Sequence, residues 1–187
     1  TLVNVWSTTK AIVSLAVAQA AASGRLHYNR PVASVWPEFA AAGKEKITVA
    51  HLLSHSAGLS GWDIDVAIDD IYDWNKLTTA LAAQEPWWEP GTASGYHALT
   101  QGYLVGEVVR RITGKSLGAT FREEIAGPLN ADFWIGLPAS EDARVADLIP
   151  PDAGLGATDD PKSWSGRTFR TPKVTGHEPK TRAWRGA

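Results

Sequence analysis

The pattern of hydrophobic and polar positions predicts a mostly helical protein. Residues 8–23 are rich in alanine and apolar almost all round, and the run ends at Gly24. Strong helix formers, a glycine stop and apolar side chains on every face are typical of a buried central helix. Three further helices are expected where apolar positions recur at helical spacing, namely 76–84, 98–113 and about 116–125.

Shorter elements are expected between these helices. Pro31 can open a short helix, and Thr48 is suited to cap another that Gly58 stops. Residues 62–75 interleave aspartates with apolar side chains, which predicts a short helix or lid with one solvated acidic face. A calcium-binding loop would need a glycine and a terminal glutamate that this stretch lacks.

The hydrophobic pattern disappears near residue 150. The remaining residues are rich in proline, glycine, aspartate, serine and threonine, with scattered tryptophans and no periodicity. We therefore predict a helical domain over 1–149, which carries the candidate chemistry, and an extended, basic connecting segment over 150–187.

Charge is distributed unevenly along the chain, although the net charge is only −2. Residues 161–187 are basic, while the residues before them are acidic overall. A basic tail of this kind can attract nucleic acid or an acidic membrane surface. Alternatively, the tail is a stretch whose packing partner is missing. We favour this second interpretation and expect neither nucleic acid nor a membrane as partner.

Composition excludes several kinds of site. The chain has no cysteine, so it has neither a disulfide framework nor a thiolate nucleophile. Its longest apolar run is too short to span a membrane. It also has no methionine and begins as if in the middle of a protein, so we expect a processed chain or an excised piece. We expect a cytoplasmic location, with a periplasmic one left open because the N-terminus of the protein is not seen.

The candidate nucleophile is Ser7, which Lys10 follows three residues later at the beginning of the first long helix. Side chains three positions apart share one helix face, so the hydroxyl and the amine can come within hydrogen-bond reach. A serine hydroxyl needs a partner to take its proton, and a partly desolvated lysine can do so. The beginning of a helix also favours a developing oxyanion.

Other candidate residues lie near the second long helix. Tyr96 is expected at the beginning of the helix over 98–113, where a phenol can shuttle protons to a leaving group. Trp87 and Trp88, in a rigid loop, and His97, beside the tyrosine, are taken as substrate-binding residues, although aromatic residues in a loop more often close a core.

The pair His51 and His55 is spaced for one helix face, as metal ligands can be. No glutamate lies between them and no third ligand follows at a recognisable spacing. We therefore expect a structural, hydrogen-bonding pair, and neither a metal nor any other cofactor.

Taken together, these motifs resemble the class C β-lactamase-like serine hydrolases, with the family VIII carboxylesterases as the nearest branch. The resemblance rests on phrases that occur in order between Trp6 and about Leu137: Ser-Thr-Thr-Lys at 7–10, His-Leu-Leu-Ser-His-Ser-Ala-Gly-Leu at 51–59, Glu-Pro-Gly at 89–91 and Gly-Tyr-His-Ala at 95–98. By resemblance, Ser7 is the acylated nucleophile, Lys10 its base and Tyr96 the acid and base of both half-reactions.

The resemblance has two departures. Ala98 stands where lactamases and penicillin-binding relatives have the asparagine of Tyr-x-Asn, which fits the esterase branch and argues against strong β-lactam turnover. The Lys-Thr-Gly-like motif of the family is also missing, because Lys173-Val174-Thr175-Gly176 has an intervening valine, a preceding proline and no strand pattern around it.

The resemblance therefore implies the helical part of an α+β fold, with most of the antiparallel sheet missing. The expected function is hydrolysis of short-chain carboxylic esters, and weakly of β-lactams, through an acyl-serine intermediate. Activity is expected to be impaired because the sheet carries one oxyanion donor. The alternatives are a penicillin-binding D-Ala-D-Ala peptidase or β-lactamase, and a non-catalytic helical module that self-associates through the open face.

Overall fold

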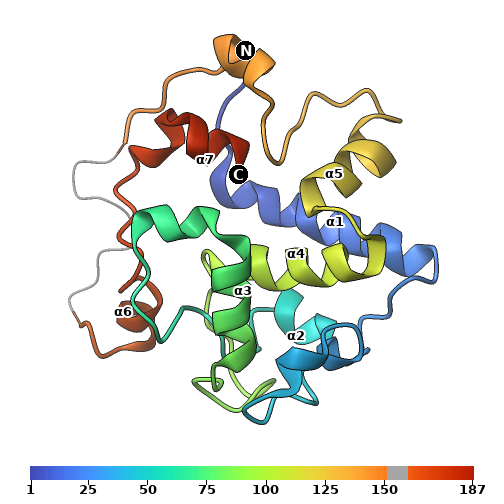
Figure 1. The fold of residues 1–187 in the computed structure, drawn as a ribbon, viewed down its shortest axis with the longest axis vertical. Coiled ribbons are helices and arrows are strands. Elements are labelled where there is room, and N and C mark those ends of the chain that lie inside the picture. Colours follow the sequence, from blue (N-terminus) through green and yellow to red (C-terminus); the bar gives the residue numbers. More distant parts are fainter. Residues whose placement is uncertain (151–159) are drawn as a thin grey trace.

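The computed structural model describes residues 1–150 and 160–187 of the chain. The longer helices are α1 (Thr9–Ala22), α3 (Trp74–Ala83) and α4 (Thr100–Thr113) (Figure 1). The shorter α-helices are α2 (Val49–Leu53), α5 (Leu117–Phe121), α6 (Trp164–Thr168) and α7 (Arg182–Gly186). A π-helical turn, Arg122–Ala126, continues α5. The 3-10 helices are Trp6–Thr8, Val32–Ser34, Pro37–Ala40, Ile68–Tyr72, Ala139–Arg144 and Glu178–Lys180.

Extended pairing is minimal in the described part of the chain. It consists of two isolated bridges, a parallel one between Leu2 and Val145 and an antiparallel one between Pro31 and Thr48. The predominance of helices therefore agrees with the hydrophobic pattern. None of the helices in the described part of the chain combines the length and the hydropathy that a membrane span requires.

The core is built around α4, which contacts α1, α2, α3 and α5. Leu104, Val105 and Val108 of this helix are fully buried. In Figure 1, α4 and α1 run through the middle of the molecule, with α3 crossing in front of α4. The Cβ of any residue other than glycine at 106 would come within 2.6 Å of the Trp74 indole, so glycine lets α3 approach α4 closely.

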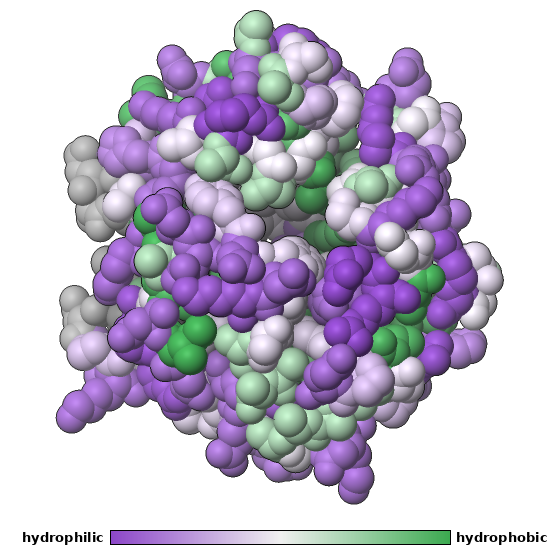
Figure 2. Space-filling model, in the orientation of Figure 1, coloured by the Kyte–Doolittle hydropathy of each residue, from purple (hydrophilic) through white to green (hydrophobic). Residues whose placement is uncertain are grey.

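Helix α1 is less enclosed than its apolar sequence predicts. It buries one face, which includes Val13, Val17 and Ala20, while Leu15 on another face is 46% exposed. The physical reason is that α4 and α5 pack against one side of α1 in the described part of the chain. Figure 2 shows a mainly hydrophilic surface that is hollowed above its centre, where hydrophobic side chains are visible.

Local signals determine several helix ends. The Thr48 side chain accepts a hydrogen bond from the His51 N–H, and His51 Nδ1 accepts one from the Thr48 N–H, which forms a reciprocal cap on α2. Ser116 caps α5, and Gly114 ends α4 in the left-handed conformation. In the described residues there is no cluster of three metal-ligating side chains.

The tail differs from the extended segment that the sequence predicts. Its described part, 160–187, contains α6, α7 and one 3-10 helix, and it packs against residues 60–66. The Thr171 hydroxyl accepts a hydrogen bond from the Val66 N–H and donates one to the Val66 carbonyl. These contacts give the tail a partner within the same chain, the acidic stretch, which the sequence pattern did not predict. Residue 150 is the boundary of the two predicted domains, and this boundary stays a prediction.

Candidate active site

Ser7 and Lys10 are brought together by the junction of two helical segments. Ser7 lies in the 3-10 helix Trp6–Thr8, and Lys10 lies in the first turn of α1. The Lys10 Nζ donates a hydrogen bond to Ser7 Oγ at 3.3 Å and another to the Ala98 carbonyl at 2.8 Å. Ser7 is exposed, so an incoming group can reach its hydroxyl.

The residue before Ser7 has an unusual backbone. Trp6 has a φ of 45°, which is uncommon for a residue with a large side chain. Its N–H donates to Asn4 Oδ1 at 2.8 Å, and its indole makes an edge contact with Trp184 of α7, with 5.9 Å between ring centroids. The far end of the chain therefore helps to hold the segment that carries Ser7.

Tyr96 approaches the same lysine from another part of the chain. The Lys10 Nζ lies 4.9 Å from the centre of the Tyr96 ring, and the tyrosine is 47% exposed. Helix α4 begins at Thr100, four residues after Tyr96, so the tyrosine precedes the helix instead of opening it as the sequence predicts. The loop over 95–98 therefore places Tyr96 beside Lys10, and its Ala98 carbonyl accepts the hydrogen bond from Lys10.

His97, the residue after Tyr96, is fully buried, and burial lowers its pKa to about 4. Its Nε2 accepts a hydrogen bond from the Leu59 N–H at 3.2 Å, and its Nδ1 bonds the Gly95 carbonyl. Since one ring nitrogen accepts and the other donates, neutral His97 satisfies both partners.

A cavity of about 1120 Å³ opens beside these groups. Ser7, Lys10 and Tyr96 all line it, together with the apolar side chains of Val5, Val13, Phe133, Ile135, Phe169 and Trp184. A largely apolar cavity with a few convergent polar groups is the usual form of a small-molecule site. The geometry thus combines a nucleophile, an amine and a phenol at one wall of an apolar space.

Trp87, Trp88 and His97 lie outside the set of residues that line this cavity. Trp88 packs edge-on to His97, with 6.1 Å between ring centroids, and it stacks over Gly95, where a Cβ would come within 2.5 Å of the indole. Trp87 lies parallel to Trp164 of α6 at 6.2 Å. These contacts are structural, and direct substrate contact by the three residues stays a prediction.

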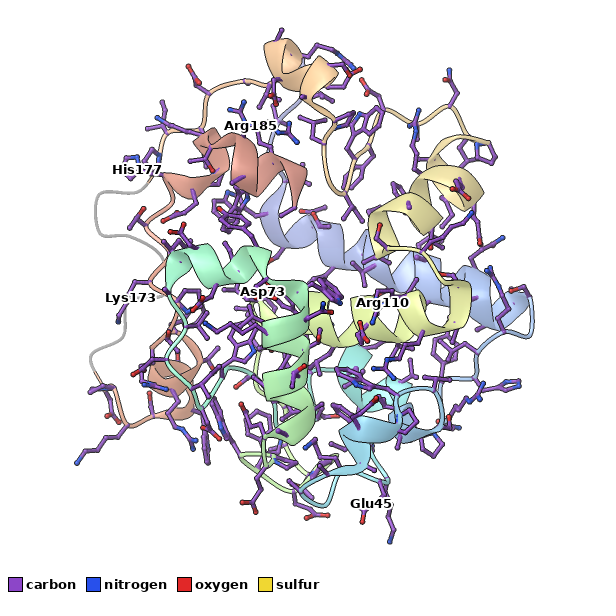
Figure 3. The ribbon with its side chains drawn as sticks, viewed as in Figure 1. Glu45, Asp73, Arg110, Lys173, His177 and Arg185 are labelled. Carbon is purple, nitrogen blue, oxygen red and sulfur yellow. The ribbon has the colours of Figure 1, made fainter. Side chains whose placement is uncertain are left out.

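The segment Lys173-Val174-Thr175-Gly176 does not deliver a basic residue to the cavity. Pro172 and Val174 line it, whereas Lys173 does not, and Figure 3 shows Lys173 at the outer edge of the molecule. The Thr175 hydroxyl donates to Glu178 at 2.8 Å. This placement agrees with the interpretation of the segment as something other than a Lys-Thr-Gly-like element.

Sequence reasoning missed two contributors to the site. Trp184 lies in a segment without hydrophobic periodicity, and no local signal indicates that it reaches Trp6. The spacing of His55 indicates only a pairing with His51, whereas its ring lies 4.9 Å from the Tyr96 ring. The signal that includes His55 is the stretch 51–59, on which the family resemblance partly rests.

Comparisons with known proteins agree with this arrangement. A family model described as Beta-lactamase matches residues 1–179. The chain is 40% identical over 149 residues to the Esterase/beta-lactamase LipL of Mycobacterium tuberculosis, which covers 79% of this chain and 34% of that protein.

Solved structures are similar over almost the whole chain. A family VIII carboxylesterase is 47% identical with a TM-score of 0.88, over 97% of this chain and 48% of that one. A penicillin-binding protein homologue from Caulobacter crescentus is 44% identical with a TM-score of 0.78, over 93% of this chain and 50% of that one. The chain thus spans about half the length of these solved relatives, and the prediction of the helical part of this α+β fold is confirmed.

Proposed function

The chain belongs to the beta-lactamase family, and from this premise we propose that it is the helical part of a serine hydrolase that cleaves short-chain carboxylic esters, and β-lactams weakly. The observation that carries the proposal is the contact between Lys10 Nζ and Ser7 Oγ at 3.3 Å, at the wall of a largely apolar cavity. Paired nucleophile and base at this distance are the signature of nucleophilic catalysis.

In the proposed mechanism, Lys10, with Tyr96, takes the Ser7 proton as Ser7 Oγ attacks the ester carbonyl. The bond from Oγ to the carbonyl carbon forms, and the tetrahedral oxyanion rests on the Ser7 N–H at the beginning of the helical segment. Tyr96 passes a proton to the leaving alcohol as the ester C–O bond breaks. Water then attacks the acyl carbon, and Tyr96 takes a proton from the water. The bond from Oγ to the acyl carbon breaks, and Lys10 returns its proton to Ser7 Oγ. No metal or organic cofactor takes part.

Ester preference is supported by residue 98 and by the names of relatives. Ala98 has no side-chain amide to offer a β-lactam, and it contributes its carbonyl to Lys10 instead. LipL is named as an esterase and β-lactamase, and one solved relative is a family VIII carboxylesterase. The penicillin-binding homologue favours a second candidate, a D-Ala-D-Ala peptidase or β-lactamase, whose signature is stable acylation by labelled penicillin.

Turnover by these 187 residues alone is expected to be weak. Loss of one oxyanion donor costs about 10²–10³ in rate. A non-catalytic module is the third candidate, because the large apolar cavity would then be an exposed surface that drives self-association. Sedimentation of the purified chain over a range of concentrations distinguishes a monomer from a self-associating module.

The test is acylation of Ser7. We expect a fluorophosphonate probe to add to Ser7, as read by peptide mass spectrometry, and p-nitrophenyl acetate to be hydrolysed slowly. Ser7→Ala should abolish both, whereas Ser14→Ala should not, because Ser14 lies on α1 and its hydroxyl donates to the Lys10 carbonyl, away from the Lys10 amine. A labelled chain whose adduct persists in Ser7→Ala would overturn the assignment.

The role of Tyr96 is tested separately. Tyr96→Phe should lower the rate of hydrolysis by at least about 10²-fold, the lower end of what one acid or base contributes. Tyr28→Phe is the matched control, since that phenol is similarly exposed, at 43%, and does not line the cavity. Full activity in Tyr96→Phe would contradict the proton-shuttle role.

A further inference from the structure

His55 makes three contacts with the segment that carries Tyr96. The Gly95 N–H, one residue before Tyr96, donates to the His55 carbonyl at 3.0 Å. The His97 N–H, one residue after Tyr96, donates to His55 Nδ1 at 3.0 Å. The imidazole also packs against the phenol ring, with 4.9 Å between centroids and planes inclined at 56°. One residue therefore holds Tyr96 on both sides of its backbone and on one face of its ring.

The backbone of His55 is bent to make these contacts. Its φ is 60°, in the left-handed region that is uncommon for residues other than glycine, although histidine adopts it more often than most. Residues in such conformations cost about 1–3 kcal/mol and persist where the surrounding structure holds them. Here the conformation directs both the carbonyl and the ring of His55 toward the 95–97 segment.

The contact with His97 also requires a particular form of the imidazole. Because Nδ1 accepts a hydrogen bond, a neutral His55 carries its proton on Nε2. That atom lies 3.4 Å from the Gln101 Nε2, which donates hydrogen bonds to the Leu52 and Leu53 carbonyls at 3.3 Å.

The surroundings keep His55 neutral. Burial lowers its pKa, and the positive charge of Lys10 on α1 lowers it further. The other titratable groups that face it are Tyr96 and His97, both from the 95–98 loop. A protonated ring would lose the acceptor that holds the His97 N–H.

We propose that His55 is a positioning residue, which holds the Tyr96 phenol beside Lys10 through the Gly95 and His97 backbone amides. This inference rests on the proposed function, in which the Tyr96 phenol transfers protons to the leaving alcohol and from water. A displacement of about 1 Å in a reacting group can cost about 10²-fold in rate. His55 itself does not line the cavity, so it acts through Tyr96.

Two substitutions separate positioning from folding. His55→Gly removes the ring and its acceptor but tolerates the left-handed backbone, so the Gly95 N–H keeps its carbonyl. His55→Asn also tolerates that backbone and restores a side-chain oxygen as acceptor. We expect kcat for p-nitrophenyl acetate to fall about 10²-fold in His55→Gly with KM little changed, and His55→Asn to regain most of the loss.

His51→Ala is the control for general destabilisation, because it removes one of the two capping hydrogen bonds of α2, the helix that ends just before His55. Loss of kcat in His51→Ala as large as in His55→Gly would overturn the inference. So would a His55→Asn variant that is as impaired as His55→Gly.

A second readout does not depend on activity. The chain is labelled with 3-fluorotyrosine, and the Tyr96 resonance is identified by its absence in Tyr96→Phe. Its fluorine shift should change in His55→Gly and return toward the parent value in His55→Asn, while an unchanged shift in His55→Gly overturns the inference. If the parent chain neither labels with fluorophosphonate nor hydrolyses esters, the proposed function fails, and the fluorine shift still decides whether His55 positions Tyr96.

Discussion

Arginine–carboxylate pairs occur both in the helical core, on α4, and in the contacts of the tail, 160–187, but their surroundings differ. On α4, Glu107 is 1% exposed and accepts hydrogen bonds from Arg110, Arg111 and the Trp74 indole at 2.7–2.8 Å. In the tail, the Arg170 guanidinium meets the Asp65 carboxylate at 2.6 Å, but the carboxylate is 91% exposed.

This difference shows why similar distances do not mean similar energies. An exposed ion pair forms in surroundings where water already solvates and screens both charges. It therefore contributes only about 0–1 kcal/mol to the free energy of unfolding. A buried carboxylate that loses its partners keeps the cost of desolvation, so its removal or protonation has a large effect. The helical core should therefore govern global unfolding, while the tail should respond to salt and detach locally.

The largest expected effect is a cavity in the core. Leu104→Ala removes a fully buried side chain of α4, and such substitutions cost about 2–5 kcal/mol. Urea unfolding followed by circular dichroism measures this loss in the free energy of unfolding. Leu15→Ala is the matched control on α1, because that leucine is 46% exposed and its truncation should cost well below 1 kcal/mol. Equal losses in both variants would contradict the assignment of the core.

The second test uses the buried carboxylate. Burial alone would raise the pKa of Glu107, but hydrogen bonds from Arg110, Arg111 and Trp74 prevail and lower it to about 2. A lowered carboxyl pKa stabilises the fold above the unfolded value of 4.5, and this stability is lost as the pH falls toward 2. The contribution at neutral pH is about 3 kcal/mol. Unfolding measured between pH 6 and pH 2 should show this loss in the parent and much less of it in Glu107→Gln.

The third test uses the buried histidine beside Tyr96. Burial lowers the pKa of His97 from 6.5 to about 4, so the unfolded chain binds a proton at a higher pH than the folded one. Stability from this group is complete above pH 6.5 and is lost as the pH falls to about 4, by at most about 3 kcal/mol. His97→Gln should remove this dependence from the unfolding curve, whereas the exposed control His27→Gln should retain it. A parent chain with constant stability from pH 7 to pH 4.5 would contradict the neutral buried state.

The smallest effect is expected in the tail. Arg170→Ala breaks the exposed pair with Asp65 and should change the free energy of unfolding by less than about 1 kcal/mol. Limited proteolysis is the more sensitive measurement, and cleavage within 160–187 should become faster in the variant and in high salt. Lys173→Ala is the control, because Lys173 lies at the outer edge of the molecule in Figure 3. If Arg170→Ala lowered the free energy of unfolding as much as Leu104→Ala does, the tail would have to unfold together with the core.

Much of the helical half was predictable because its signals are local. The ends of α1 and α4 follow from glycines, and the end of α2 follows from Thr48, since caps act within one helical turn. The helices of the tail could not be predicted, because their signals are not local. Its helices α6 and α7 have five residues each, too few for a hydrophobic period, and they are held by residues more than 100 positions away, such as the Ser60 partner of Thr168.

The contact of Ser7 with Lys10 follows from the sequence alone, because a spacing of three residues on a helical segment brings two side chains together whatever surrounds them. The groups that join this pair depend on the packing of distant segments. The Ala98 carbonyl reaches Lys10 from 88 positions away, and Trp184 reaches Trp6 from the other end of the chain. Contacts of this kind follow from the packing of whole helices, and no pattern within a short stretch of sequence encodes them.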